Sequence, residues 1–139
     1  MNTEKIKAYL DGRQSLIKTL GMNLVSTEAE NSCTATMKVT PEVSQPYGFL
    51  NGGTSLALAE NLAGVGSVSL CPDKIPMGSS VSANHLQAVP VGDTVTIVAT
   101  ILHKGRTTHV WNVNVLTPNG QVASTARVTN YLVDPQPAR

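Results

Sequence analysis

The chain has 139 residues, of which 41% are hydrophobic and 14% are charged, and its net charge is +1. This length predicts one domain over 1–139 without room for a second, and the near-neutral charge argues against the broad basic surface of nucleic-acid-binding domains. The charged fraction is well below the usual quarter of residues, which predicts that a second copy of the chain covers part of the surface, because closed homo-oligomers are the commonest soluble assemblies.

The first predicted element is an amphipathic helix over residues 3–20, where apolar side chains recur at helical spacing. Gly21 is placed to end it. Two strands are then predicted over 22–30 and 32–40, the second being rich in Thr. The segment 41–53 holds two prolines and three glycines, which predicts a loop.

A second helix is predicted over 54–70, with Asn51 or Thr54 as its N-cap. Its apolar residues lie on every side, which is typical of a helix wrapped by other structure. Gly64 and Gly66 lower its intrinsic stability by about 1 kcal/mol each. They also permit another part of the chain to approach the helix backbone closely.

The remainder of the chain is predicted to form four strands separated by glycine-containing turns, over 79–89, 93–104, 107–117 and 121–133. A tail over 134–139 is predicted to be disordered. Short turns favour antiparallel pairing. The order of elements therefore predicts an α+β fold, in which one antiparallel sheet packs against a long apolar helix.

The two cysteines, Cys33 and Cys71, lie far apart without metal-binding or redox spacing. They predict free thiols in a reducing compartment. Residues 1–10 lack the apolar core of a signal peptide, and 54–71 is too interrupted by polar residues to span a membrane. The three histidines show no metal-ligand spacing. The sequence therefore predicts a cytoplasmic protein without a metal site or membrane partner.

Glu60 is the single charged residue between Val43 and Pro72, and it lies in the middle of the second predicted helix. Three interpretations are open. The side chain faces solvent, as most glutamates do; it forms an ion pair with a distant residue such as Arg127; or it is a catalytic carboxylate in a cleft.

The loop before this helix ends in Asn51-Gly52-Gly53. Two glycines at a helix start can expose backbone N–H groups at the positive end of the helix dipole, where an anion or a developing oxyanion binds. A turn that requires positive φ explains a glycine pair equally well. Oxyanion donors together with Glu60 on the same helix would supply the parts of an acyl-transfer site.

Four segments resemble one known family. Residues 45–53 (QPYGFLNGG) followed by 58–60 (LAE) are similar to the signature of hotdog-fold thioesterases, and 84–86 (NHL) and 105–111 (GRTTHVW) resemble later parts of the same family. The most similar branch, which is PaaI-like, hydrolyses aromatic acyl-CoA such as 4-hydroxybenzoyl-CoA and 1,4-dihydroxy-2-naphthoyl-CoA. The resemblance implies a hotdog fold, an antiparallel sheet wrapped around a long central helix.

The resemblance also implies a mechanism. Glu60 would attack the thioester carbonyl or activate a water to do so, which are two roles that the sequence leaves open. The Gly52 N–H would stabilise the oxyanion, and Gln45 would orient the acyl group. The family places this site at a dimer interface, commonly in a tetramer built as a dimer of dimers. No cofactor is implied, because CoA is part of the substrate.

The resemblance implies that His85 lines the same cleft and that Arg106 binds the 3′-phosphate of CoA, with Gly105 and Thr107 adding backbone and hydroxyl contacts. From the residues alone, the basic cluster of His103, Lys104, Arg106 and His109 indicates a solvated hairpin tip.

Two positions depart from the family pattern. Asn51 replaces the usual His, so this position can form hydrogen bonds in the catalytic site but cannot shuttle a proton. Gly64 replaces a Ser or Thr that helps to hold the hydrolytic water, and Asn61 and Ser67 are the nearest polar residues. Two alternatives therefore stay open: a non-catalytic acyl-CoA binding protein, and an acyl-thioester dehydratase or hydratase that depends on His85.

Overall fold

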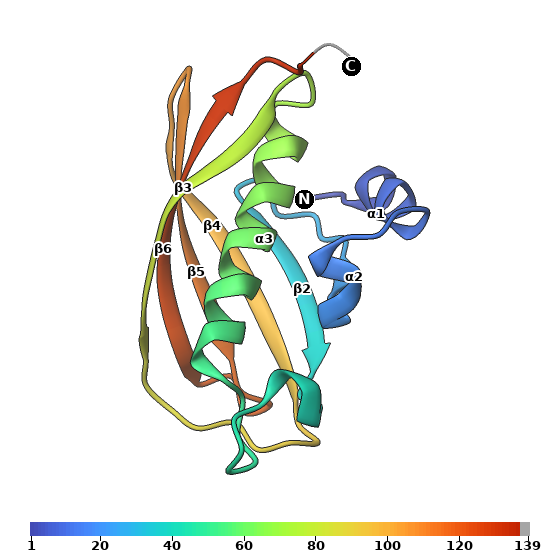
Figure 1. The fold of residues 1–139 in the computed structure, drawn as a ribbon. Helices are drawn as coiled ribbons and strands as arrows, with labels where there is room; N and C mark the ends of the chain where they lie inside the picture. The colour runs from blue at the N-terminus through green and yellow to red at the C-terminus, as the bar shows by residue number, and fades with distance from the viewer. Residues whose placement is uncertain (137–139) are drawn as a thin grey trace.

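The computed structural model describes residues 1–136, which form one antiparallel sheet and three α-helices. The strands are β1 (Asn23–Val25), β2 (Ser32–Lys38), β3 (Ile75–His85), β4 (Thr94–Lys104), β5 (Thr108–Leu116) and β6 (Val122–Val133). The helices are α1 (Glu4–Asp11), α2 (Leu16–Leu20), α3 (Gly52–Leu70) and the short 3-10 helix η1 (Pro41–Val43). The sheet has the order β1-β2-β4-β5-β6-β3 and curves around α3 (Figure 1). The predicted α+β architecture is confirmed.

The core lies between α3 and the concave face of the sheet. Alternate residues of the three strands β2, β4 and β5 point towards α3 and are buried: Cys33, Ala35, Met37, Val95, Ile97, Ala99, Trp111, Val113 and Val115. The helix contributes Leu58 and Leu62, both fully buried. Burial of an aliphatic side chain of this size stabilises the fold by about 1.5–3 kcal/mol. The period of two in the strands therefore fixes which face of the sheet receives the helix.

Gly66 provides the close backbone approach that the sequence predicts. A Cβ atom there would lie 2.8 Å from Cζ2 of Trp111, so the indole ring occupies the space that a side chain would take. At Gly64 no atom lies within 4 Å of the corresponding position. The two glycines therefore differ: Gly66 packs against the sheet, and Gly64 leaves open space beside the helix.

The prediction of one helix over 3–20 is wrong, because two helices, α1 and α2, occupy that range. Ser15 breaks the run: its extended backbone precedes α2, and its hydroxyl accepts a hydrogen bond from the Lys18 N–H at 3.4 Å. The apolar spacing continues through the break, so it does not reveal it. Gly21 ends α2 in the left-handed conformation with φ of 73°, as predicted.

The strand predicted over 22–30 is much shorter in the structure, where β1 covers three residues. Beyond it, the amino group of Met1 donates hydrogen bonds to the Thr27 hydroxyl at 3.0 Å and the Ser32 carbonyl at 2.9 Å. The Thr27 N–H in turn donates to the Met1 carbonyl at 3.0 Å. Hydrogen bonds with Met1 thus take the place of a strand ladder in this segment.

The strand predicted over 79–89 is shifted, because β3 begins at Ile75 and ends at His85. It pairs with β6 alone and forms one free edge of the sheet. The pairing register changes between Gly78 and Ser80, which is a β-bulge. The other strands agree with their predicted ranges to within about two residues at each end, as is usual for element boundaries.

Three further predictions concern the C-terminal tail, the two cysteines and a membrane span. Of the predicted disordered tail 134–139, residues 137–139 lie outside the described residues, and 134–136 form no helix or strand. Cys33 and Cys71 are both free. Burial raises the pKa of the Cys33 thiol to about 11, so this thiol is inert. Within the described part of the chain, no helix has the length and apolar character needed to cross a bilayer.

A buried polar cluster joins α3 to β5 and β6. The Ser67 hydroxyl lies 3.0 Å from Nε1 of Trp111, 3.1 Å from Nδ2 of Asn130 and 2.9 Å from Nδ1 of His109. The indole and amide nitrogens can only donate, so they occupy both lone pairs of the Ser67 oxygen. The hydroxyl proton is therefore donated to His109 Nδ1, which fixes the neutral tautomer of His109 with its proton on Nε2. Trp111 is thereby fixed in the core, where it is fully buried.

This cluster predicts a loss of stability in mild acid. Burial, and then the nearby charges of Lys104 and His103, hold the pKa of His109 below 6.5. In the unfolded chain His109 takes up a proton as the pH falls through about 6.5. In the folded protein His109 takes up its proton only at a lower pH. The free energy of unfolding therefore falls as the pH drops through 6.5 towards the lower folded-state value.

Urea unfolding at pH 7.5 and 5.5 measures this effect. We expect the wild type to be less stable at pH 5.5, and His109→Gln to show a smaller difference between the two pH values. His103→Gln is the comparison variant, because His103 is exposed and contributes less than burial to the lowered pKa of His109, so most of the pH dependence should remain. An equal pH dependence in His109→Gln and the wild type would contradict the assignment.

Candidate functional site

The loop between η1 and α3 is tied into a fixed shape by its own backbone. The Gln45 N–H donates to the Phe49 carbonyl at 2.8 Å, and the Gly48 N–H donates to the Gln45 carbonyl at 3.2 Å. Gly48 has φ of 86°, a conformation that glycine adopts without strain. The Leu50 N–H bonds to the Val89 carbonyl at 2.8 Å, which anchors the loop to the chain after β3. Gln45 is thereby held half-buried near the start of α3.

Asn51 is the N-cap of α3, as predicted. Its side-chain oxygen accepts a hydrogen bond from the Gly53 N–H at 2.7 Å. Thr54, the other candidate cap, instead donates its hydroxyl to the Val43 carbonyl at 2.9 Å. The Gly52 N–H has no acceptor among the described residues. It remains an available donor at the positive end of a 19-residue helix.

A cavity of about 300 Å³ opens at this helix start. Its walls are formed by Gln45, Phe49, Leu50, Gly52, Ser55, His85, Leu86, Gln87, Ala88 and Ala123. The structure therefore brings together Gln45, Gly52 and His85, three of the residues singled out from the sequence. This size lies at the lower end of ligand pockets.

His85 reaches the cavity from the end of β3. Its Nδ1 lies 2.7 Å from the Ser124 hydroxyl on the paired position of β6. Its Nε2 lies 2.7 Å from the place where a Cβ of Gly52 would be, so the missing side chain of Gly52 makes room for the imidazole. No sequence motif marks Ser124, because only the β3–β6 register shows that it faces His85.

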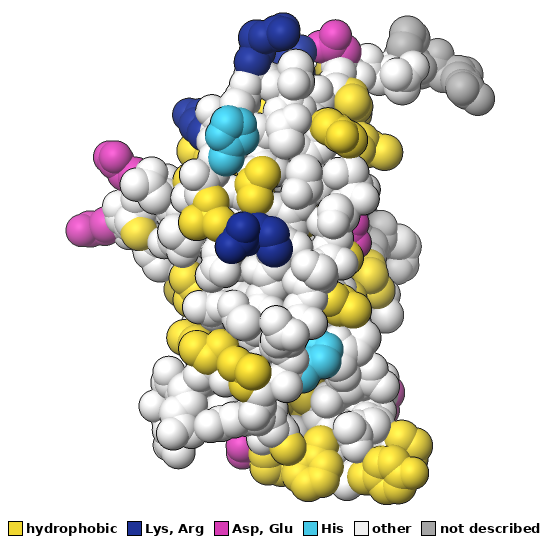
Figure 2. Space-filling model, turned by 90° about the vertical axis from the view of Figure 1, so that its left-hand side faces the viewer, with side chains coloured by type: hydrophobic (Ala, Val, Ile, Leu, Met, Phe, Trp, Pro, Cys, Tyr) yellow, Lys and Arg dark blue, Asp and Glu magenta, His cyan; other side chains and the backbone are white. Residues whose placement is uncertain are grey.

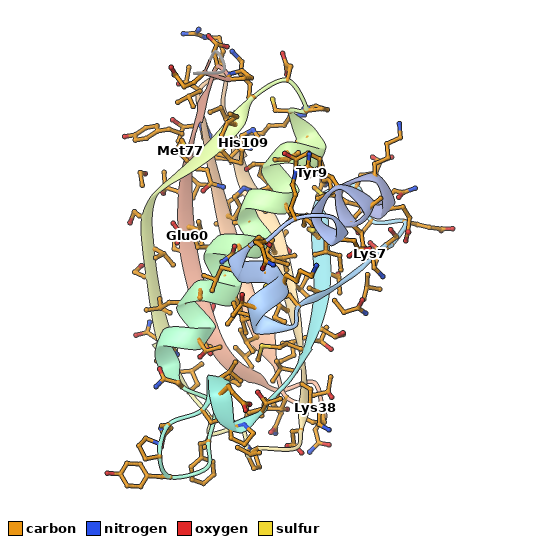
Figure 3. All side chains as sticks on the ribbon, turned by 45° about the vertical axis from the view of Figure 1, so that its right-hand side comes forward. Lys7, Tyr9, Lys38, Glu60, Met77 and His109 are labelled. Carbon is orange, nitrogen blue, oxygen red and sulfur yellow. The ribbon has the colours of Figure 1, made fainter. Side chains whose placement is uncertain are left out.

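Glu60 lies midway along α3, outside this cavity (Figure 3). It is exposed, and its carboxylate lies against Gly78 of β3. Gly52 and Glu60 are eight residues apart on one helix, which separates their backbones by about 12 Å along the axis. In a single chain the carboxylate and the Gly52 N–H therefore cannot contact the same small group.

The ion pair of Glu60 with Arg127 is wrong, because the salt bridge found within residues 1–136 joins Lys74 and Asp134 instead. The solvent-facing interpretation describes the side chain in a single chain. The next residue, Asn61, is half-buried, and its amide donates to the Ala57 carbonyl at 2.8 Å, one turn back on α3. The sequence also predicts Asn61 and Gly64 as site residues. Both lie on α3 close to Glu60, and neither lines the cavity.

The turn that contains Gly105, Arg106 and Thr107 lies at the other end of the molecule. In Figure 1 this β4–β5 turn is at the top and the start of α3 is at the bottom. The Gly105 N–H donates to the Thr108 carbonyl at 2.9 Å, and Arg106 is exposed. His109 does not belong to this basic cluster, because it is fully buried against Ser67. Within one chain, the structure does not bring Arg106 to the cavity.

A metal site is not evident in the described residues 1–136, since no three His, Cys, Asp or Glu side chains gather closely enough to hold an ion. The groups at the cavity are instead a backbone N–H, a carboxamide and an imidazole. They can polarise a carbonyl group by hydrogen bonding and stabilise an oxyanion.

The chain is similar to known proteins over most of its length. The profile of the Thioesterase superfamily matches residues 47–124. A 1,4-dihydroxy-2-naphthoyl-CoA hydrolase of Listeria monocytogenes is 36% identical over 115 residues, which cover 82% of this chain and 92% of that protein.

Two solved structures are similar to this chain in their overall fold. A mutant thioesterase from Pseudomonas aeruginosa has a TM-score of 0.86 and 33% sequence identity, covering 97% of this chain and 96% of the other. A protein from Streptococcus mutans bound to acetyl-CoA has a TM-score of 0.72 and 28% identity, covering 84% of this chain and 91% of the other.

Proposed function

The chain belongs to the thioesterase superfamily, and on that premise we propose that it hydrolyses an acyl-CoA thioester with an aromatic or otherwise bulky acyl group. Its fold is the hotdog fold and it is a thioester hydrolase. The observation that carries the proposal is the cavity at the start of α3, where the unpaired Gly52 N–H, Gln45 and His85 converge. The non-catalytic and dehydratase alternatives have no comparable support.

The proposed reaction begins when the thioester carbonyl oxygen accepts hydrogen bonds from the Gly52 N–H and the Gln45 carboxamide. A water oxygen attacks the carbonyl carbon while Glu60 takes one proton from that water. The tetrahedral oxyanion is stabilised by the same two donors. Its collapse breaks the C–S bond, and the proton held by Glu60 passes to the CoA thiolate. Direct attack by Glu60, with an anhydride that water then hydrolyses, gives the same products.

We propose that two copies of the chain build each site, with Glu60 supplied by one copy and Gly52 and Gln45 by the other. A reacting carbonyl must lie about 3 Å from both the nucleophile and the oxyanion donors, which the separation of about 12 Å along one helix does not allow. Glu60 is exposed beside β3, and β3 is a free sheet edge that can pair with another strand.

A site built from two copies also bears on the oligomeric state and on the binding of CoA. Figure 2 shows a face on which uncharged side chains predominate, with Lys or Arg side chains near its middle and at its upper rim. A mostly uncharged face suits burial between copies in a dimer of dimers. A two-copy site would also allow Arg106, with Gly105 and Thr107, to reach the CoA 3′-phosphate from a neighbouring chain. We further propose a cytoplasmic enzyme that needs no cofactor; the free thiols support the first point.

A thiol-release assay over a panel of CoA thioesters tests the proposed activity. We expect benzoyl-CoA and hydroxybenzoyl-CoA to be hydrolysed with higher kcat/KM than acetyl-CoA and long-chain acyl-CoA, and a chelator to leave these rates unchanged. A preference for long linear acyl groups would contradict the proposed acyl class. Turnover that a chelator removes would contradict a cofactor-free reaction.

A further inference from the structure

Gly78 on β3 lies directly opposite the proposed catalytic carboxylate. A Cβ atom built on Gly78 would overlap Oε1 of Glu60, and it would lie 2.9 Å from Cδ and 3.2 Å from Cγ of the same side chain. These three atoms are the nearest neighbours of that position. The carboxylate therefore occupies the space that any side chain at residue 78 would need.

The backbone does not explain why residue 78 is glycine. The glycines with positive φ in the described residues are Gly21, Gly48, Gly92 and Gly120, and Gly78 is not among them. Alanine could adopt the backbone conformation found here, and glycine inside a strand lowers stability. A side chain at this position would instead meet Glu60, whose carboxylate would have to move to make room.

The strand is also irregular at this residue. Gly78 pairs with Asn130, and Ser80 pairs with the adjacent Thr129, so Ser79 is the extra residue of a β-bulge. Bulges are enriched at sheet edges and beside active sites, where they change the direction of the strand. Here the bulge immediately follows the residue that contacts Glu60.

From this geometry we propose that Gly78 is a positioning residue for the reaction: its missing side chain admits the Glu60 carboxylate to the edge of β3 and holds it on one line of approach. The carboxylate forms no salt bridge among the described residues, so its close approach to Gly78 is the contact that orients it. The inference rests on the proposed function, because it requires Glu60 to act on the thioester.

The test begins with Gly78→Ala. The added methyl displaces the carboxylate, and we expect kcat on the best CoA thioester to fall by about 10- to 100-fold, the loss that a displacement near 1 Å produces, with KM nearly unchanged. Gly12→Ala is the matched control, since it adds the same methyl at φ of −87° with no atom within 4 Å. Gly12→Ala should keep the wild-type kcat. A Gly78→Ala enzyme with wild-type kcat overturns the inference.

A double-mutant cycle with Glu60→Asp separates positioning from general damage to the strand. Aspartate is one methylene shorter and retracts from the added methyl. Glu60→Asp should therefore cost less kcat in the Gly78→Ala background than in the wild type. Losses that simply multiply would overturn the inference. If Gly78→Ala fails to fold, Gly78→Ala with Glu60→Ala should fold and melt like Glu60→Ala alone, and failure of that rescue would overturn it as well.

The two proposals fail in different ways. Full turnover in Glu60→Gln removes Glu60 from the reaction and with it the proposed mechanism. Lost turnover in Glu60→Gln together with an unaffected Gly78→Ala removes only the positioning role of Gly78.

Discussion

Glu60→Gln is expected to lower kcat for CoA-thioester hydrolysis by about 10²–10⁴-fold, the range that a positioned acid–base group contributes. Glutamine has nearly the same shape but can neither take a proton from water nor attack as a carboxylate. KM should change less than kcat, because Glu60 acts on the attacking water and the transition state rather than on the bound thioester. The melting temperature should also stay near that of the wild type, since Glu60 is exposed and forms no salt bridge with any residue of 1–136.

Glu28→Gln is the matched control for this substitution, because it neutralises another exposed glutamate, which lies between β1 and β2. It should retain wild-type turnover. Single-turnover hydrolysis in ¹⁸O-labelled water then distinguishes the two roles of Glu60. Label in the Glu60 carboxylate after one turnover identifies a nucleophile, because water has then opened the anhydride at its Glu60 carbonyl. A general base leaves that carboxylate unlabelled and places the label in the product acid. Glu60→Gln with normal kcat would show that another group activates the water.

The elements with strong local signals are those that the sequence predicts well. The apolar run of α3, its Asn51 cap and the glycine-containing turns agree with the structure because each depends on neighbouring residues. β3, in contrast, lies about four residues before the range that the sequence predicts for it. As an edge strand it buries none of its side chains fully, so the alternation that marks a half-buried strand is weak there. The sequence does not reveal the break between α1 and α2, since the apolar spacing persists across Ser15.

The candidate site shows the same limit at a finer level. Gln45, Gly52 and Glu60 stand out because they occur together in a short segment. Ser124 and Gly78 carry no such signal, because their importance comes from contacts across the fold. Ser124 faces His85 only in the observed β3–β6 register, and a shift of one residue would turn it to the other face of the sheet. Gly78 gains its role from the position of α3 over β3.

A second large effect is expected when two inactive variants are combined in one oligomer. Gln45→Ala removes a hydrogen-bond donor to the thioester carbonyl and should lower kcat by about 10²-fold. Glu60→Gln should lower kcat at least as much. If each site takes Gln45 from one chain and Glu60 from the other, a heterodimer of the two variants contains one site with both substitutions and one with neither. That heterodimer should recover about half of the wild-type activity, because a two-fold dimer has two equivalent sites.

Co-expression of the two chains with different affinity tags yields the heterodimer for this measurement. Sites built within one chain would predict the opposite result, because every site would then carry one substitution and the activity could not exceed the mean of the two homodimers. A heterodimer of Glu60→Gln with the wild-type chain is the control, since both arrangements predict about half of the wild-type rate for it. Only the first heterodimer separates them. Recovery there would follow directly from the geometry of α3, whose Gly52 and Glu60 are too far apart to act on one carbonyl.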